Sequence, residues 1–404
     1  MDLADLDWLR SPAGAAVLAE LAAAGPIDDA AALRLATRLR RDHPASRTAA
    51  ALTQARLRQR GAAKFGAAAA GMWFTPDGLE QASHPAAAGH RTARMAAALP
   101  AGAGVLDLCC GIGADLSVLA DAGVKSAGVD IDPVTVAVAA ANLGDRAPVT
   151  VGDATKQNLS AVDAVFLDPA RRSARGRVFN PNAYSPPWAF VHDLLDGRVK
   201  AAAAKVAPGI PHEIVPTGVE TEWVSVRGEV KEAALYSGAL ASGARRRATL
   251  LPGGDTLAAA GADTEEVPPP VGRPGRWLYE PDGAVIRAHL VGAVVEAVDG
   301  RLLDPTIAYV TADSYVPTPF ATAYEIHDVL PFGVPRLRAL LAERGVGIVV
   351  VKKRGSSVLP EQLRRELLRG SRGGNVEATV VVTRHGGGQI AMVVQPVKLT
   401  GRQE

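Results

Sequence analysis

Residues 103–115, AGVLDLCCGIGAD, decide the fold of this 404-residue chain. A short apolar run ends at Asp107, and Gly111 and Gly113 follow it before an apolar segment of helical character. Glycines at such a point allow a tight turn and let backbone amides approach a ligand. A strand, a glycine turn and a helix in succession are typical of a parallel sheet covered on both faces. The stretch therefore predicts a doubly wound α/β domain with a ligand loop after its first strand.

The same loop indicates which ligand it binds. A dinucleotide-binding loop has the pattern G-x-G-x-x-G, which requires a third glycine at the position of Leu116. The carboxylate of Asp107 would repel a pyrophosphate, but it suits the amino group and the sulfonium of S-adenosylmethionine. The pattern D-x-x-x-G-x-G therefore predicts a methyl-donor loop.

Three further aspartates follow predicted strands in the same region. Asp130 ends VKSAGVD about 20 residues beyond the loop, where a carboxylate can accept both ribose hydroxyls. Asp153 follows VTVG, where it could accept from the adenine amino group, and Asp168 follows AVFL. Asp132 is expected to cap the next helix rather than bind a ligand. Four acidic strand ends in order, at one edge of one sheet, together predict a donor site.

Composition restricts the class of protein. No run approaches the roughly 20 apolar residues of a membrane span, and MDLADLDWLR lacks the regions of a secretory signal, so we expect a cytoplasmic protein. The two cysteines, Cys109 and Cys110, are adjacent, which predicts reduced thiols and excludes a cysteine zinc site. The histidines lack metal-ligand spacing, and no P-loop motif occurs, so we expect neither a metal nor a nucleotide triphosphatase.

Charge and composition divide the chain into four expected regions. Residues 1–85 are predicted to be helical, and residues 86–252 to form the α/β domain with an antiparallel edge. Residues 253–325 combine a linker rich in glycine and proline with a small acidic α+β unit. Within that unit, residues 284–298 are expected to contain a strand and a helix. Residues 326–404 are expected to form a basic α+β domain.

Over residues 86–252 the chain resembles the class I S-adenosylmethionine-dependent methyltransferases. Its whole architecture, with DPARR after the fourth strand, is similar to the bacterial THUMP-like-domain methyltransferases, a group expected to act on RNA. The resemblance implies a Rossmann-like methyltransferase sheet with an N-terminal helical region and C-terminal α+β (THUMP-like) units. It also implies donor-binding residues: Asp107, Gly111 and Gly113 for the methionine part, Asp130 for the ribose and Asp153 for the adenine, with Cys109 and Asp115 in the same loop.

Two segments compete for the role of catalytic loop. Enzymes that methylate exocyclic amines commonly carry Asp, Asn or Ser followed by Pro-Pro-aromatic after the fourth strand. Asp168 and Pro169 keep the first half of this pattern, and the planar guanidinium of Arg171 could stack in place of the aromatic. Arg172, Arg175 and Arg177 would make the loop attractive to phosphates, unless it is a solvated basic turn.

The second segment is Ser185-Pro-Pro-Trp188, which fits the same pattern 17 residues further along the chain. Prolines and an aromatic at a helix start are common for structural reasons, so a structural role is favoured here. Residues 168–172 are therefore the predicted catalytic loop, and Trp188 could fold back as a stacking platform.

The available residues also narrow the chemistry. Methylating C5 of a pyrimidine needs a cysteine nucleophile, and the only cysteines lie in the donor loop. Methylating a nitrogen needs no covalent step, because a lone pair aimed at the methyl group gains most of its rate from proximity. We therefore expect Asp168 to orient a base amine and take its proton.

Two basic segments predict a polyanionic partner. Nine Lys and Arg against three acidic residues lie between Asp28 and Lys64, and ten against three between Pro331 and Arg372. Either segment could instead be a solvated face. With few aromatics nearby, the second suits structured ribosomal or transfer RNA, and its expected contact residues are Lys352, Lys353 and Arg354.

Three alternatives and one further contact remain at this point. GMWFTPDGLE resembles the segment before the core of guanine-N2 methyltransferases, which suggests that Trp73 and Phe74 stack on a base. The alternatives to an RNA methyltransferase are a non-catalytic RNA-binding or ribosome assembly factor, a protein methyltransferase and a small-molecule methyltransferase. The oligomeric state does not follow from the sequence.

Overall fold

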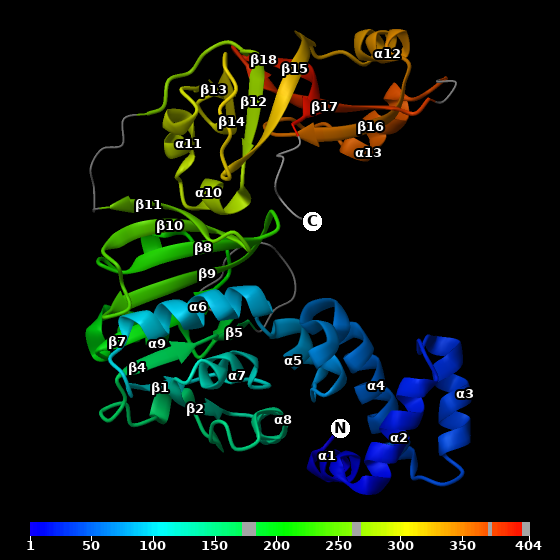
Figure 1. Ribbon diagram of the computed structural model, residues 1–404, viewed down its shortest axis with the longest axis vertical. Coiled ribbons are helices and arrows are strands. Elements are labelled where there is room, and N and C mark those ends of the chain that lie inside the picture. Colours follow the sequence, from blue (N-terminus) through cyan, green and yellow to red (C-terminus); the bar gives the residue numbers. More distant parts are fainter. Residues whose placement is uncertain (172–182, 261–267, 371–373, 398–404) are drawn as a thin grey trace. The chain divides into compact units, whose positions relative to one another are not determined.

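The computed structural model describes residues 1–171, 183–260, 268–370 and 374–397 (Figure 1). The chain divides into two compact units. The first unit comprises Met1–Val226 and Lys231–Arg245, and the second comprises Arg227–Val230 and Arg246–Glu404. No helix in the described ranges is both long and apolar enough to cross a membrane.

Helices begin the first unit, as the sequence predicts. They are α1 (Leu3–Arg10), α2 (Pro12–Ala23), α3 (Asp29–Leu39) and α4 (Ala45–Phe65). The side chains of Asp2, Ser11 and Asp28 each accept a backbone N–H at the start of the helix that follows, which satisfies an otherwise unpaired donor. Leu6 and Leu57 share a buried cluster with Ile112 and Val138, so these helices pack on the α/β part of the same unit.

A largely parallel sheet forms the centre of the first unit, with strands in the order β8-β9-β7-β4-β1-β2-β3. Its strands are β1 (Gly104–Asp107), β2 (Lys125–Asp130), β3 (Val149–Val151), β4 (Ala164–Leu167), β7 (Ala201–Val206), β8 (Glu220–Val226) and β9 (Glu229–Gly238). Strands β3, β2, β1, β4 and β7 are parallel to one another, and β9 is antiparallel to β7. This arrangement confirms the predicted doubly wound α/β fold and its antiparallel edge.

Helices accompany these strands along the chain (Figure 1). They are α5 (Pro76–Gln81), α6 (Pro85–Ala98), α7 (Ala114–Asp121), α8 (Pro133–Leu143) and α9 (Trp188–Asp193). Asp132 caps α8 as predicted, because its carboxylate accepts the N–H of Thr135 at 2.9 Å. A separate pair of short strands, β5 (Ala170–Arg171) and β6 (Tyr184–Ser185), lies between β4 and α9 in the sequence.

Small residues let the layers of this unit pack closely. All four residues of β4 are buried, and Ala201–Ala204 of β7 are fully buried. Leu116, which replaces the third glycine of a dinucleotide loop, is also fully buried, and it packs against Gly128 on β2. A Cβ at residue 128 would lie 2.6 Å from the Leu116 side chain. The glycine that a dinucleotide loop has on its helix is therefore replaced here by a glycine on the neighbouring strand.

The second unit contains a seven-stranded sheet in the order β13-β14-β12-β15-β18-β17-β16. Its strands are β12 (Trp277–Pro281), β13 (Arg301–Asp304), β14 (Ile307–Ala312), β15 (Ala321–Pro331), β16 (Val346–Lys353), β17 (Val376–His385) and β18 (Gly388–Pro396). Helices α12 (Val334–Glu343) and α13 (Pro360–Leu367) bury Leu337, Leu341, Leu363 and Leu367 in one cluster with β16, β17 and β18. Strands β10 (Ala244–Leu251) and β11 (Asp255–Ala260) are not part of this seven-stranded sheet, and they lie next to each other.

Two expectations for this unit differ from the structure. The expected acidic unit and the expected basic domain contribute strands to the same sheet, because β15 pairs with β12 and also with β18. Residues 284–298 form two helices, α10 (Gly283–Arg287) and α11 (Val291–Ala297), so the expected strand is wrong. The carboxylate of Asp282 starts α10 by accepting the N–H of Ala284, and His289, with φ +55°, separates the helices. Local capping outweighs the β-branched composition.

Candidate active site

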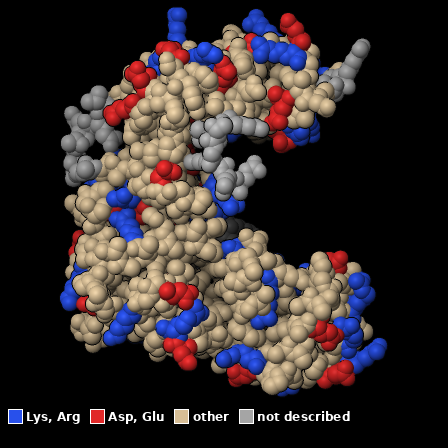
Figure 2. Space-filling view, in the orientation of Figure 1, with Lys and Arg blue, Asp and Glu red and all other residues tan. Residues whose placement is uncertain are grey.

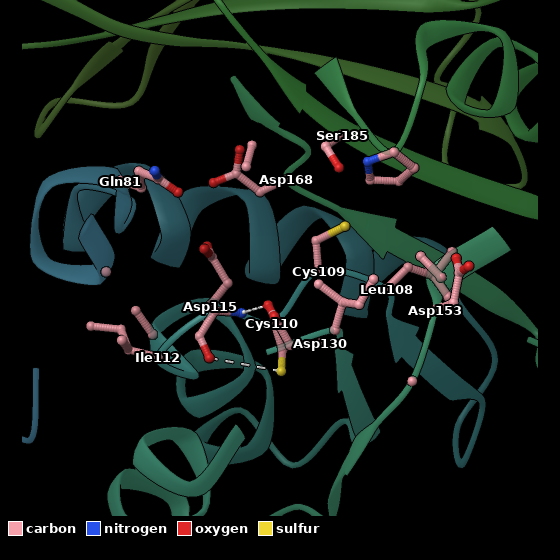
Figure 3. Close-up of a pocket in the computed structure, with 18 of the residues that line it drawn as sticks. Gln81, Leu108, Cys109, Cys110, Ile112, Asp115, Asp130, Asp153, Asp168 and Ser185 are labelled. Atoms are coloured by element: carbon pink, nitrogen blue, oxygen red, sulfur yellow. Dashed lines mark hydrogen bonds between the residues drawn. The ribbon is translucent and has the colours of Figure 1, made fainter. Parts of the chain in front are cut away.

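A cavity of about 420 Å³ opens at the carboxyl ends of the parallel strands (Figure 3). This volume lies within the range of about 300–1,000 Å³ that small-molecule sites occupy. The structure brings six predicted site residues to its walls: Cys109, Gly111, Asp115, Asp130, Asp153 and Asp168. They follow β1, β2, β3 and β4, because the carboxyl ends of parallel strands meet at one sheet edge. Asp107 and Gly113, which were also predicted to bind the donor, do not line this cavity.

Backbone geometry explains the two glycines of the loop. Gly111 has φ +53° and Gly113 has φ +80°, a left-handed conformation that side chains other than glycine rarely adopt. The N–H of Gly111 donates to Oδ2 of Asp130 at 3.0 Å, and the N–H of Asp132 donates to Oδ1 at 3.1 Å. These bonds tie the end of β2 to the loop after β1, and they orient the Asp130 carboxylate at the cavity.

Asp107 provides a test of whether the cavity suits a cationic donor. Its side chain is 1% exposed and accepts the N–H of Cys109 at 3.2 Å. Burial, the Asp115 carboxylate and more weakly Asp168 and Asp130 raise the pKa of Asp107 well above its usual value. A positive charge bound nearby would offset this accumulation of buried carboxylates. The residues therefore fit S-adenosylmethionine, whose amino and sulfonium groups supply such charge.

The raised pKa of Asp107 predicts that donor binding depends on pH. Below this pKa the carboxyl is protonated and neutral, and above it the carboxylate attracts the cationic donor. We expect the affinity for S-adenosylmethionine to rise as pH rises through the raised pKa, and calorimetry at a series of pH values measures this. In Asp107→Asn the corresponding rise should be missing. An affinity of the unsubstituted protein that does not change with pH would contradict this role.

Asp168 forms an ion pair that the sequence did not reveal. Its Oδ2 contacts Nζ of Lys205, near the end of the neighbouring strand β7. Burial lowers the pKa of Lys205, but the neighbouring carboxylates, Asp168 first among them, raise it by more. The side chain therefore stays an ammonium. No other described residue forms a hydrogen bond with the Asp168 carboxylate. A single lysine in an alanine-rich strand was the only sequence signal for this pair.

A buried arginine, also missed in the sequence, supports the site from α6. The side chain of Arg91 is 3% exposed, and its guanidinium forms ion pairs with Asp115 and Glu232. Ser83 donates to the second oxygen of Asp115 at 2.8 Å. Asp115 is therefore held by the protein at both oxygens, which makes it a fixed wall of the donor cavity.

The pairing of β5 with β6 adds a second position to the structural role that the sequence favoured for residues 185–188. Ala170 pairs with Ser185, which brings Ser185, Pro186 and Pro187 to the walls of the same cavity as Asp168. Figure 3 shows Ser185 and Asp168 on the same side of the cavity. Residues of both competing segments therefore line one cavity.

Other predicted residues have different surroundings. Pro169 lines a neighbouring cavity, and Arg171 pairs through its backbone with Tyr184. Trp188 starts α9, where its ring lies 6.1 Å from that of Tyr184, and it does not line the donor cavity. Arg172, Arg175 and Arg177 lie outside the described residues.

The predicted base-stacking role of Phe74 is wrong. Its side chain is fully buried in a cluster with Leu57 and Leu79, so no base can reach it. Trp73 is partly buried beneath the guanidinium of Arg58, 4.7 Å from the ring centre, and it does not line the donor cavity. Phe74 is therefore part of the core, and base stacking by Trp73 stays a prediction.

Both cysteines are unsuited to nucleophilic attack. Burial first, and then nearby carboxylates including Asp107, raise the pKa of the Cys109 and Cys110 thiols. Both thiols therefore stay protonated at neutral pH. Among the described residues, no group of three or more His, Cys, Asp or Glu is arranged to hold a metal ion.

Comparison with known proteins agrees with this geometry. Residues 2–61 match a family described as a domain of unknown function (DUF8688), and residues 321–396 match a family described as THUMP domain-like. The crystal structure of a "putative methyltransferase" from Porphyromonas gingivalis W83 has the same fold, with a TM-score of 0.68 and 20% identity over 92% of this chain and 100% of that one.

A protein of Mycobacterium tuberculosis, present in two strains, is described as an uncharacterized S-adenosylmethionine-dependent methyltransferase. It is 37% identical to this chain over 350 residues, which cover 83% of this chain and 93% of that protein. Identity of this extent over most of both chains, together with a cavity suited to the donor, is the mark of one family. The protein belongs to the S-adenosylmethionine-dependent methyltransferases that carry a THUMP-like domain.

Proposed function

We propose that this protein methylates a base nitrogen in structured RNA. The observation that carries the proposal is the placement of Asp168 and Ser185–Pro187 on one cavity wall. This wall combines an acidic side chain followed by proline with a second proline-rich segment. Such a wall suits the binding of a planar base that carries an amine. The donor supplies an electrophilic methyl group whose bond to sulfur breaks as the new bond to nitrogen forms.

The chain's own residues would orient the acceptor and handle its proton. Asp168 would accept a hydrogen bond from the amine and so aim the nitrogen lone pair at the methyl group. After transfer the amine proton would pass to the same carboxylate. Lys205 would hold Oδ2 of Asp168, leaving Oδ1 to face the acceptor.

The titration of the site favours nitrogen over carbon as the acceptor atom. A pyrimidine carbon needs a thiolate, and both thiols stay protonated. A base nitrogen needs only orientation and a late proton acceptor.

Basic surface in the second unit supports RNA as the partner (Figure 2). Figure 2 shows Lys and Arg side chains over this unit, interspersed with acidic ones. Lys353, Arg336, Arg365 and Arg369 are exposed. Lys352 and Arg354, also expected to contact RNA, lie 2.7 Å and 3.6 Å from the Glu280 carboxylate, so their charge is partly neutralised. The match to the THUMP domain-like family agrees with a role in RNA binding.

The test is transfer of tritiated methyl groups to RNA from a strain that lacks this gene, followed by sizing and nucleoside analysis. We expect label in one RNA size class, on a base nitrogen. Label on protein, or no label despite donor binding, would overturn the proposal, and absence of donor binding would favour an assembly factor.

RNA affinity should also depend on salt. Removing one basic side chain that binds a phosphate is expected to reduce the slope of log affinity against log salt by about 1. The triple variant Lys353→Ala, Arg365→Ala, Arg369→Ala should therefore have a slope that is less steep by about 3 than that of the unsubstituted protein. Lys200→Ala, an exposed lysine before β7, is the control. Equal slopes in the triple variant and the control would exclude this surface.

A further inference from the structure

A second cavity of about 580 Å³ adjoins the donor cavity within the first unit. Gln81, Ala82, Asp168 and Ala170 line both cavities. Asp168 therefore stands where the two cavities meet. The second cavity is further walled by the ends of α4 and β7 and the start of β9, including Lys64, Tyr184, Lys205, Ala207, Lys231 and Glu232.

Glu232 lines this cavity and has a hydrogen-bond acceptor without a donor among the described residues. Its side chain is 1% exposed, and Oε1 is held by the guanidinium of Arg91. Its other oxygen, Oε2, is buried and receives no hydrogen bond from the described residues. A buried carboxylate oxygen without a donor costs free energy, so a ligand N–H that reaches it gains that energy on binding.

The lysines of the cavity do not form a phosphate site. Nζ of Lys64 donates to the carbonyl oxygens of Leu79, Glu80 and Ala82 at 2.7, 3.2 and 2.9 Å. These three bonds use all the donors of an ammonium group. Lys205 is held by Asp168, so two of the three lysines already have anionic or carbonyl partners. The cavity thus presents carboxylate oxygens to a ligand more than free cations.

We propose that the second cavity binds the acceptor base, and that Glu232 selects a base by accepting its N–H groups. The ligand class is a nucleobase with an exocyclic amine, whose N–H donors match Oε2 of Glu232 and the carboxylate of Asp168. Binding there sets the amine at the junction with the donor cavity. This inference rests on the proposed function, because it assigns the acceptor of the same reaction.

The test uses Glu232→Gln in the full-length protein saturated with S-adenosylhomocysteine. Oε1 of the glutamine can still accept from Arg91, but an amide N–H then replaces the free acceptor and opposes the N–H groups of the base. Binding of adenosine, guanosine, cytidine and uridine is followed by NMR titration. We expect an amine-bearing nucleoside to bind better than uridine, and to bind Glu232→Gln at least about tenfold more weakly. Affinity for S-adenosylhomocysteine should change less than about twofold.

Two further variants keep the test decisive. Ala207 lines the second cavity but not the first, so Ala207→Trp should abolish nucleoside binding while sparing S-adenosylhomocysteine. Glu213→Gln, an exposed glutamate, should change neither. Equal nucleoside affinity in the unsubstituted protein and in both cavity variants, or no nucleoside binding at all, would overturn the inference.

RNA kinetics separate this inference from the proposed function. Where RNA is methylated, Glu232→Gln should raise KM for RNA about tenfold or more with a smaller change in kcat. If the Glu232→Gln variant methylates RNA with an unchanged KM, only the base-selecting role of Glu232 is contradicted. If nucleoside binding depends on Glu232 but no RNA is methylated, the proposed function is contradicted, and the assignment of the second cavity as a base-binding site is retained.

Discussion

Asp168→Asn should lower kcat/KM for methyl transfer by about 10²–10⁴-fold. The asparagine keeps the size of the side chain, but it cannot take the proton that the amine releases, and its amide no longer attracts Lys205. Since donor contacts elsewhere in the cavity are unchanged, donor affinity should stay within about threefold. Single-turnover kinetics with labelled donor, alongside calorimetry of donor binding, measure both quantities.

A matched control separates loss of the catalytic group from loss of charge. Asp193→Asn removes a carboxylate that is 58% exposed on α9 and pairs with Arg198. This variant should retain full turnover. If Asp168→Asn turned over as fast as this control, Asp168 would not be the proton acceptor, and the catalytic role would have to move to another group on the cavity wall.

Arg91→Met should destabilise the folded protein by about 3–5 kcal/mol, because it leaves the buried carboxylates of Asp115 and Glu232 without their partner. Methionine retains most of the side-chain volume, so the loss reflects charge more than a cavity. Chemical denaturation followed by circular dichroism measures the free energy of unfolding. A loss below about 1 kcal/mol would contradict the role assigned to this arginine.

The destabilisation should depend on pH in a defined direction. Burial raises the pKa of Glu232, while Arg91 and Lys205 oppose this rise. Removing Arg91 raises that pKa further in the folded state. A carboxyl with a raised folded-state pKa favours folding at low pH, and this contribution is lost as pH rises through the folded pKa. The loss of unfolding free energy caused by Arg91→Met should therefore be smallest at acid pH. Arg198→Met, in an exposed pair, should lose at most about 1 kcal/mol at any pH.

Local sequence signals predicted the donor side of the site. The glycine loop, Asp130, Asp153 and Asp168 each follow a strand in chain order, and parallel strands place their carboxyl ends on one edge. The cap of α8 by Asp132 spans only three residues. Such features depend on neighbours within a few residues, so the amino-acid order alone determines them.

The proposed acceptor side depended on contacts between distant parts of the chain. Asp168 and Lys205 are 37 residues apart, and Arg91 and Glu232 are 141 residues apart. No periodicity or spacing relates such pairs, because only the packing of strands and helices decides which buried charges meet. The same reason explains why Phe74 became part of the core and why Ser185 reached the cavity through the pairing of β5 with β6.

The amino-acid sequence by itself determined the α/β class, the order of the acidic strand ends and the donor loop, since these follow from residue type and local spacing. Tertiary structure alone decided which segment faces Asp168, which charges support it and where a second cavity opens. Side-chain partners are set by how completely each group is removed from water, and that is a property of the packed molecule.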